Sequence, residues 1–183
     1  IFNNQELRSR LLKHHFKSVS DCEVIIHLYE EYGEEFINQI KGQFAFILWD
    51  QKKGYIIAAR DRFGICPLYY LNTQGDYFFA SEIKALLKYL PAASLNIEGI
   101  VQTLFFYGPE YSKTCFKEIC QVPPGYYLRL NVATKRLLMK RYWQLQFFDV
   151  QPKLDRQEIL DQFNFLLKQA VKRRLQGNSI PGV

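Results

Sequence analysis

The sequence predicts an α+β protein in which layered β-sheets are covered by helices. Helical spacing of apolar residues comes first along the chain, and short continuous apolar runs follow it. Only a few turn-forming residues separate neighbouring runs, which favours antiparallel hairpins. Strands that are apolar on both faces need cover on both faces, so we expect the sheets inside the fold and the helices outside.

The first forty residues predict helices. Residues 4–16 place three leucines on one face, Leu7, Leu11 and Leu12. A second helix is expected to begin at Ser20, because Ser20 and Glu23 have the spacing of a capping box. Gly33 is expected to end it, and 34–40 to add another helical turn or two.

Apolar runs with strand character follow these helices. The first four runs span 44–49, 55–59, 68–71 and 77–80. Lys-Lys-Gly separates the first pair and Asn-Thr-Gln-Gly-Asp the second, and both links suit hairpin turns. Two helices are then expected over 83–89 and 96–105. After the turn signal Pro-Pro-Gly, a further hairpin is predicted over 126–130 and 137–142.

The end of the sequence predicts a long amphipathic helix. Asp155 and Glu158 can cap its start, and Gly177 is expected to end it. Its apolar face contains Ile159, Leu160, Phe163, Leu166, Leu167, Ala170, Val171 and Leu175. Residues 146–154 before it read as a linker, and 179–183 after it as the entry to a strand.

Charge is distributed unevenly along the 183 residues. The formal net charge is +6, yet residues 1–134 contain 14 positive and 14 negative side chains. Residues 135–183 contain ten positive and four negative ones, and therefore the whole excess. We expect no nucleic-acid partner, because most of the chain is neutral. We expect no membrane partner either, because no apolar run approaches the roughly 18 residues of a membrane span.

Cysteines and histidines form no motif that predicts a metal site. The cysteines lack CxxC spacing and are interpreted as buried free thiols in a reducing cytoplasm; they are Cys22, Cys66, Cys115 and Cys120. His14 and His15 near a helix end are interpreted as solvent-exposed structural residues, and His27 within a helix as structural. The cluster Lys172–Arg174 is interpreted as the solvated face of a helix end.

Asp21 is the residue whose chemistry the spacing leaves open. It can simply be a carboxylate in a first helical turn, stabilised by the helix dipole at about 0.5 kcal/mol. It can also be a permanently ionised carboxylate that binds an incoming ammonium group, because a helix N-terminus favours the negative charge. Spacing alone does not choose between these alternatives.

Six motifs then occur in order along the chain. They are Ser20-Asp21-Cys22-Glu23-Val24, Gly42-Gln43-Phe44-Ala45-Phe46, Ala59-Arg60-Asp61-Arg62-Phe63-Gly64, Pro67-Leu68-Tyr69-Tyr70, Phe79-Ala80-Ser81-Glu82-Ile83-Lys84 and Val122-Pro123-Pro124-Gly125-Tyr126. In this order and spacing the sequence resembles the glutamine-hydrolysing asparagine synthetases, which are class II glutamine amidotransferases. The resemblance extends over essentially the whole chain.

The resemblance implies an N-terminal-nucleophile (Ntn) hydrolase fold, an αββα four-layer sandwich. It further implies the start of an α/β synthetase domain of the ATP-pyrophosphatase type. We therefore expect residues 1–145 to be a glutaminase domain that lacks its N-terminal part. Residues 146–154 would be a linker, and residues 155–183 the first elements of the synthetase domain.

The resemblance also implies a reaction for the intact protein. In the family, an N-terminal cysteine attacks the glutamine side-chain amide and forms a γ-glutamyl thioester. The released ammonia passes to the synthetase domain, where it displaces AMP from β-aspartyl-AMP. Glutamine, aspartate and ATP are the expected substrates, with Mg2+, in the cytoplasm, and a homodimer is a compatible assembly.

Most of this machinery is expected outside the chain. The family's nucleophile would lie before Ile1 and its ATP-binding loop beyond Val183, so we expect no catalytic or cofactor-binding residue here and no activity of the fragment alone. Asp21 carries over as the glutamine contact and would hold the α-ammonium group. Four further motif residues are interpreted as scaffold: Arg60, Asp61, Ser81 and Glu82.

Other functions remain open from the sequence. In some relatives that make other amides or close a β-lactam ring, the glutaminase half has lost its nucleophile and is a structural platform. The residue after the initiator Met would separate the two, since Cys there supports glutamine hydrolysis. A stand-alone glutamine-binding or nucleic-acid-binding module is disfavoured by the neutral first 134 residues.

Overall fold

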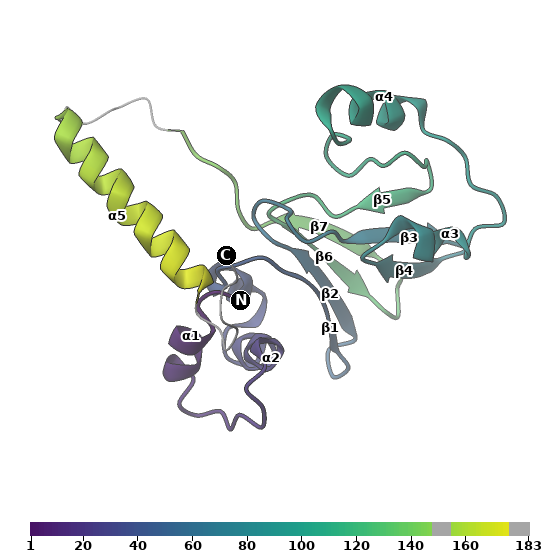
Figure 1. Cartoon of the computed structure of the whole chain (residues 1–183). Helices are drawn as coiled ribbons and strands as arrows, with labels where there is room; N and C mark the ends of the chain where they lie inside the picture. The colour runs from purple at the N-terminus through teal and green to yellow at the C-terminus, as the bar shows by residue number, and fades with distance from the viewer. Residues whose placement is uncertain (148–154, 176–183) are drawn as a thin grey trace. The chain divides into compact units, whose positions relative to one another are not determined.

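The computed structural model describes residues 1–147 and 155–175. The chain divides into two compact units, one made of Ile1–Gly42 with Leu145–Val183 and the other of Gln43–Gln144. Figure 1 labels the helices of the first unit and the strands of the second.

The first unit begins with three helical elements, α1 (Asn4–Arg10), α2 (Asp21–Tyr32) and the 3-10 helix η1 (Gly33–Gln39). Each of these elements buries apolar side chains, among them Leu7, Val24, Leu28, Phe36 and Ile37. Gly33 ends α2 as predicted, with a φ of 57° that favours glycine.

The predicted helix over 4–16 is wrong in its length. The α1 helix ends at Arg10, and the chain turns at Leu11, whose carbonyl accepts a hydrogen bond from the His14 N–H. Leu11 is buried but Leu12 is 87% exposed, so the three leucines do not share one buried face. The residues after Arg10 instead form a loop, 11–20, that connects α1 to α2.

The second unit contains two antiparallel sheets among the described residues. One has the strand order β1 (Ala45–Asp50), β2 (Tyr55–Arg60), β6 (Tyr126–Asn131) and β7 (Leu137–Arg141). The other has the order β4 (Asp76–Ala80), β3 (Tyr69–Thr73) and β5 (Ile119–Gln121). The three predicted hairpins are confirmed, whereas β5 was not predicted as a strand.

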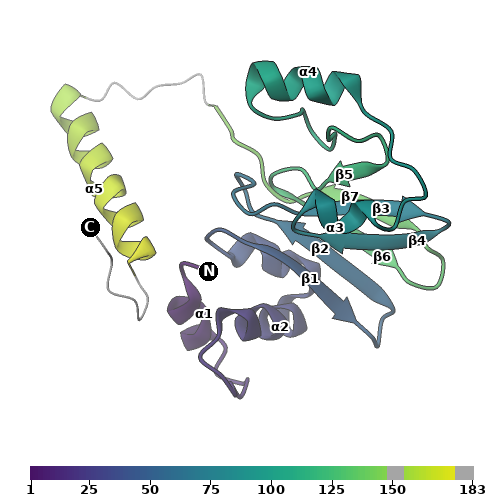
Figure 2. The ribbon, with the colours of Figure 1, turned by 45° about the vertical axis from the view of Figure 1, so that its right-hand side comes forward.

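The two sheets pack face to face. Ala58 of β2 and Leu128 of β6 belong to one buried cluster, against which Tyr70 of β3 and Phe79 of β4 pack. The opposite face of the smaller sheet is covered by helix α3 (Ile83–Leu87), which lies beside β3 and β4 in Figures 1 and 2. Adjacent residues of β3 therefore point to opposite faces of the sheet, as in any pleated strand: Tyr70 packs against the other sheet and Leu71 packs on the side of α3.

The expectation of cover on both faces is wrong at β1. Ile47 and Trp49 alternate along this strand and remain 50% and 63% exposed. The physical reason is position, because β1 is an edge strand of its sheet. Helix α4 (Ile97–Phe106), capped by the Asn96 side chain, also leaves Phe105 and Phe106 about three-quarters exposed.

The last described helix is α5 (Arg156–Arg174), and the predicted capping box between Asp155 and Glu158 is confirmed. Its apolar side chains are exposed, with Phe163 at 60% and Leu166 at 64%. Gly177, residues 179–183 and most of the predicted linker lie outside the described residues. Among the helices of the described part, none is long and apolar enough to cross a membrane.

Candidate functional site

The first three residues are fixed against the end of the 3-10 helix. The Phe2 N–H donates to the Lys41 carbonyl at 2.7 Å. The buried Asn3 side chain donates to the Gln39 carbonyl at 3.0 Å and accepts from the Lys41 N–H at 2.9 Å. Gly42 permits this approach, because a Cβ there would lie 3.0 Å from the Phe2 nitrogen. The segment Ile1–Asn3 is thereby placed beside the start of α2.

Asp21 forms an ion pair with the α-ammonium group of Ile1. The nitrogen lies 2.6 Å from Oδ2, and the Asp21 side chain stays 45% exposed. The hydrogen bond from the ammonium lowers the pKa of the Asp21 carboxyl below its ordinary value. Asp21 is also the first residue of α2, where the helix dipole favours a negative charge. The carboxylate is therefore ionised, and it already binds one ammonium group, that of Ile1.

The cap of α2 differs from the predicted capping box. The Ser20 hydroxyl accepts from the Cys22 N–H at 3.2 Å, so Ser20 is the N-cap as expected. The Glu23 side chain does not reach back to Ser20. It accepts from the N–H groups of Lys17 and Ser18 at 2.7 and 2.8 Å, because the loop before the helix folds over it. These bonds lower the pKa of the Glu23 carboxyl to about 2.

Arg8 holds the same loop from the side of α1. Its Nη2 donates to the carbonyls of Ser18 and Ser20, each at 2.8 Å. Its guanidinium lies over the Phe16 ring, 4.2 Å from the centroid. Sequence reasoning did not identify this role, since neither a motif nor helical spacing links Arg8 to residues ten or twelve positions away.

Cys22 lies beside Asp21 and is exposed, whereas the other cysteines are half-buried and likewise free. Its sulfur is 3.9 Å from Oδ1 of Asp21. Burial raises the pKa of the Cys66 and Cys120 thiols. The prediction that the cysteines are free thiols is confirmed, whereas their predicted burial is wrong for Cys22, which lies in the exposed first turn of α2.

The histidines differ from their predicted placement. His15 is exposed, as expected. His14 is only 17% exposed and lies against His27, with ring centroids 4.7 Å apart. The loop 11–20 brings the two rings together, so its path, and not a local pattern, determines this pair.

Arg60 and Asp61 lie in the second unit and are almost fully buried. Asp61 accepts from the backbone N–H groups of Phe44, Phe63, Ile65 and Cys66 at 2.9 to 3.3 Å. Arg60 donates to the carbonyls of Gly64, Cys66 and Val122 and to the Gln121 side chain. With their polar atoms used in this way, the two residues hold the loop after β2.

Ser81 and Glu82 are exposed at the start of α3, and Glu82 forms an ion pair with Lys84 at 2.7 Å. They connect β4 to the helix that covers it. A cavity of about 570 Å3 in the second unit is lined by Tyr55, Arg129, Asn131, Thr134, Arg136 and Leu138. It contains none of the residues that the sequence predicts as a substrate contact or as scaffold, and we assign no ligand to it.

Comparison with known proteins identifies relatives over nearly the whole chain. Residues 1–143 match the glutamine amidotransferase domain family. The chain is 34% identical to asparagine synthetase [glutamine-hydrolyzing] 2 of Bacillus subtilis and 37% identical to the amidase chyE of Penicillium rubens. Each alignment covers 97% of this chain, but only 25% and 26% of the relative. The chain thus spans about a quarter of the length of these relatives.

A second group of relatives is more similar over a shorter stretch. An asparagine synthetase of rice, Oryza sativa, is 54% identical over 87 residues, which are 47% of this chain and 15% of that protein. Among solved structures, the glutamine phosphoribosylpyrophosphate amidotransferase of Bacillus subtilis matches with a TM-score of 0.55 and 21% identity. It covers 79% of this chain and 28% of that one, and at this identity it shows a shared α+β fold.

Proposed function

Because this chain belongs to the glutamine amidotransferase domain family, we propose that it is the glutamine-binding part of an ATP-dependent asparagine synthetase. The intact enzyme would hydrolyse glutamine to glutamate and ammonia and transfer the ammonia to β-aspartyl-AMP. This chain would supply the substrate contact and the scaffold around it. The nucleophilic cysteine would come from chain before Ile1, so the 183 residues alone would not hydrolyse glutamine.

The observation that carries this proposal is the ion pair of Asp21. Its carboxylate holds the α-ammonium of Ile1 at 2.6 Å, and a free amino acid such as glutamine carries the same chemical group. If the chain continues before Ile1, that nitrogen becomes an uncharged peptide N–H, and the ammonium group of a substrate could then take over the ion pair with the carboxylate. Asp21 would then fix the amino-acid end of glutamine while its side-chain amide is attacked.

Contacts of the loop before α2 hold Asp21 in position. Arg8 and Glu23 bind this loop from two sides, and Ser20 caps the helix on which Asp21 begins. These contacts leave the carboxylate few alternative positions before substrate binds. In the proposed enzyme, they would lower the entropic cost of holding glutamine in the reactive orientation.

ATP and Mg2+ would be bound by a domain that follows this chain, as we expected from the sequence. The sequence contains no glycine-rich loop of the kind that cradles phosphate groups. In this proposal, therefore, no residue of this chain binds the nucleotide. Helix α5 supports a following domain, because Leu166 and Phe163 are mostly exposed on an otherwise amphipathic helix. Free thiols suit a reducing cytoplasm, where we place the protein.

The test is Asp21→Asn in the protein encoded by the complete reading frame around this chain. We expect the KM for glutamine to rise about tenfold or more, because truncating one partner of a charge pair weakens binding. Activity with free ammonia should not change, since ammonia needs no α-ammonium contact. Steady-state assays with each nitrogen donor would measure both quantities.

Asp76→Asn is the matched control, because Asp76 is exposed and forms a surface ion pair with Lys135. It should leave both activities unchanged. Equal loss of glutamine-dependent and ammonia-dependent activity in Asp21→Asn would contradict the proposal, since it would indicate a folding defect.

A second candidate function follows from the amidase relatives, which match this chain as fully as the asparagine synthetase does. In this alternative, the glutaminase half serves a different acceptor or is a structural platform. Replacing aspartate by other carboxylic acids in the same assay separates the two. ATP consumption that depends on aspartate supports the synthetase, whereas ATP consumption with another acid and not with aspartate supports the alternative.

A further inference from the structure

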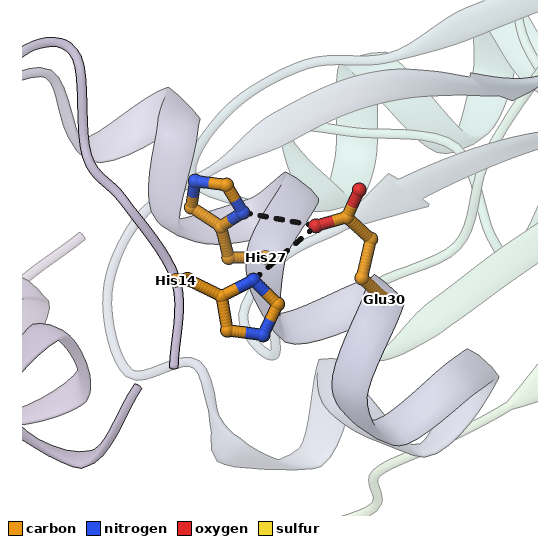
Figure 3. A group of neighbouring side chains, drawn as sticks. All are labelled: His14, His27 and Glu30. Atoms are coloured by element: carbon orange, nitrogen blue, oxygen red, sulfur yellow. Dashed lines mark hydrogen bonds and ion pairs between the residues drawn. The ribbon is translucent and has the colours of Figure 1, made fainter. Parts of the chain in front are cut away.

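Two imidazoles and a carboxylate converge between the loop 11–20 and helix α2. His14 comes from the loop, whereas His27 and Glu30 lie three positions apart on one face of the helix. Figure 3 shows both rings directed at the Glu30 carboxylate. Its Oε2 lies 2.9 Å from Nδ1 of His27 and 3.4 Å from Nδ1 of His14. The three candidate ligand atoms all lie within 4.8 Å of one another.

The two nitrogen–oxygen separations suit a metal ion of the size of zinc. Zinc binds imidazole nitrogen and carboxylate oxygen at about 2.0–2.1 Å, so two ligands of a tetrahedral site lie about 3.3 Å apart. The two nitrogen–oxygen distances lie on either side of this value. A modest adjustment of the rings would complete the site, because His14 belongs to a loop and not to a helix.

The other nitrogen of each ring also faces a carboxylate. Nε2 of His14 lies 3.2 Å from Glu31 Oε2, and Nε2 of His27 lies 3.7 Å from Glu23 Oε1. A carboxylate that is hydrogen-bonded behind a histidine fixes the ring and makes it a better ligand, as Glu31 does for His14. The arrangement therefore provides three first ligands, one carboxylate bonded behind His14 and one near His27.

One nitrogen of the His27 ring is buried without a hydrogen-bond partner. Its Nε2 is buried and lacks a hydrogen-bond partner, since the Glu23 oxygen is beyond hydrogen-bond distance. A metal ion on Nδ1 would leave the ring proton on Nε2, which then faces the Glu23 carboxylate. Binding would thus fix Nε2 as a donor aimed at a negative charge.

We propose that His14, His27 and Glu30 bind a divalent transition-metal ion of the zinc class. Imidazole with carboxylate suits zinc, cobalt, nickel and copper better than magnesium or calcium. Three protein ligands leave a fourth position for water. The ion would tie the loop 11–20 to α2, and this role does not depend on the function proposed above.

The first test is equilibrium dialysis of the 183-residue chain, without a histidine tag, against Zn2+. We expect one tightly bound zinc per chain, and its loss in His14→Asn and in His27→Asn. His15→Asn is the matched control, because His15 is exposed and next to His14 but outside the cluster. Equal binding by the parent and both cluster variants, or no stoichiometric binding by the parent, would overturn the proposal.

Carboxylate variants keep the test informative if a histidine variant does not fold. Glu30 is 54% exposed, so Glu30→Gln should fold, and we expect its zinc affinity to fall about tenfold or more. Glu31→Gln should fall about 10- to 100-fold, as for other carboxylates behind a ligand. Glu35→Gln, on η1 and outside the cluster, should bind like the parent. Parent-like binding by Glu30→Gln would contradict the site.

Cobalt distinguishes this site from thiol ligation, because Cys22 is exposed in the same unit. We expect Co2+ bound to the chain to show visible ligand-field bands without sulfur-to-cobalt charge transfer in the near ultraviolet. The bands should persist in Cys22→Ser and disappear in His27→Asn. Charge-transfer absorption that Cys22→Ser removes would instead assign the ion to the thiol.

Discussion

Two loops of this molecule are each bound by one carboxylate and one arginine, and the two carboxylates differ in their exposure to water. Asp61 holds the loop after β2 and is 1% exposed. Glu23 holds the loop before α2, and its side chain is 16% exposed. Both accept backbone N–H groups, at 2.9 to 3.3 Å for Asp61 and 2.7 to 2.8 Å for Glu23.

Because of this difference in exposure, we expect Asp61 to contribute mainly to the stability of the fold and Glu23 mainly to the position of its loop. N–H groups that lose a buried acceptor cannot turn to water, so the bonds of Asp61 should contribute strongly to the free energy of unfolding. Groups near the surface recover water when Glu23 is removed, so those bonds mainly decide where the loop lies. Substitutions in the loop after β2 should therefore destabilise the fold. Substitutions in the loop before α2 should cost little stability but should move Asp21.

The largest expected effect is that of Asp61→Ala. It leaves the buried N–H of Phe44 and the partly buried N–H of Cys66 without an acceptor, and we expect about 4 kcal/mol loss in the free energy of unfolding. Urea denaturation of the parent and the variant would measure it. Asp76→Ala, which removes an exposed carboxylate, should change stability by less than about 0.5 kcal/mol. Similar losses in the two variants would remove the contrast between buried and exposed carboxylates.

Gly64→Ala tests the same loop through its backbone. Gly64 has a φ of 65°, and a Cβ would lie 2.8 Å from Cγ of Pro124 and 3.0 Å from Cζ of Arg60. We expect a loss of about 2–3 kcal/mol from backbone strain and displacement of these neighbours. Gly75→Ala is the control, because its φ is 83° but a Cβ there meets no atom within 4 Å. It should cost about 1 kcal/mol, and a larger cost at Gly75 would show that packing around the Asp61 loop is unimportant.

Ser20→Ala should have a smaller effect on stability. It removes the hydroxyl that accepts from the Cys22 N–H at the exposed start of α2, and we expect a loss of about 1 kcal/mol. Thermal unfolding would measure the loss, with Ser9→Ala as the control, because the exposed Ser9 hydroxyl donates to the Glu6 carbonyl of its own helix and caps no helix start. A loss as large as that of Asp61→Ala would mean that the loop before α2 is as rigidly held as the loop after β2.

Glu23→Gln should have the smallest effect, and that effect should depend on pH. The pKa of the Glu23 carboxyl is about 2 in the folded chain, whereas its ordinary value is 4.5. The ionised carboxylate therefore stabilises the fold fully above about pH 4.5, and this stabilisation is lost as the pH falls from there through about 2. The difference in stability between the parent and Glu23→Gln should therefore shrink below pH 4.5. Denaturation in metal-free buffer between pH 3 and 7 would measure it. A difference that is constant over this range would contradict the role of the charge.

The helices and hairpins could be predicted from the sequence because each is encoded by a local pattern. Apolar runs with turn residues between them identified β1 with β2 and β3 with β4. The α5 capping box was also local, and it formed. The strand β5 was missed, since its three residues are too few to give a periodic pattern.

The contacts that shape the candidate site could not be predicted in this way. Glu23 was expected to cap its own helix, but the loop offered it the N–H groups of Lys17 and Ser18 instead. The approach of His14 to His27, and of Arg8 to Ser20, depends on the path of the loop 11–20. Asp21 itself was identified by resemblance, and its role in binding glutamine stays a prediction.

The exposed thiol of Cys22 gives a direct way to observe this site. Burial raises the pKa of Cys66 and Cys120, so at neutral pH a maleimide dye should label Cys22 first. A dye there would lie next to the Asp21 carboxylate, whose oxygen is 3.9 Å from the sulfur. Its fluorescence would then report in real time when an amino acid arrives at the start of α2, without any need for turnover.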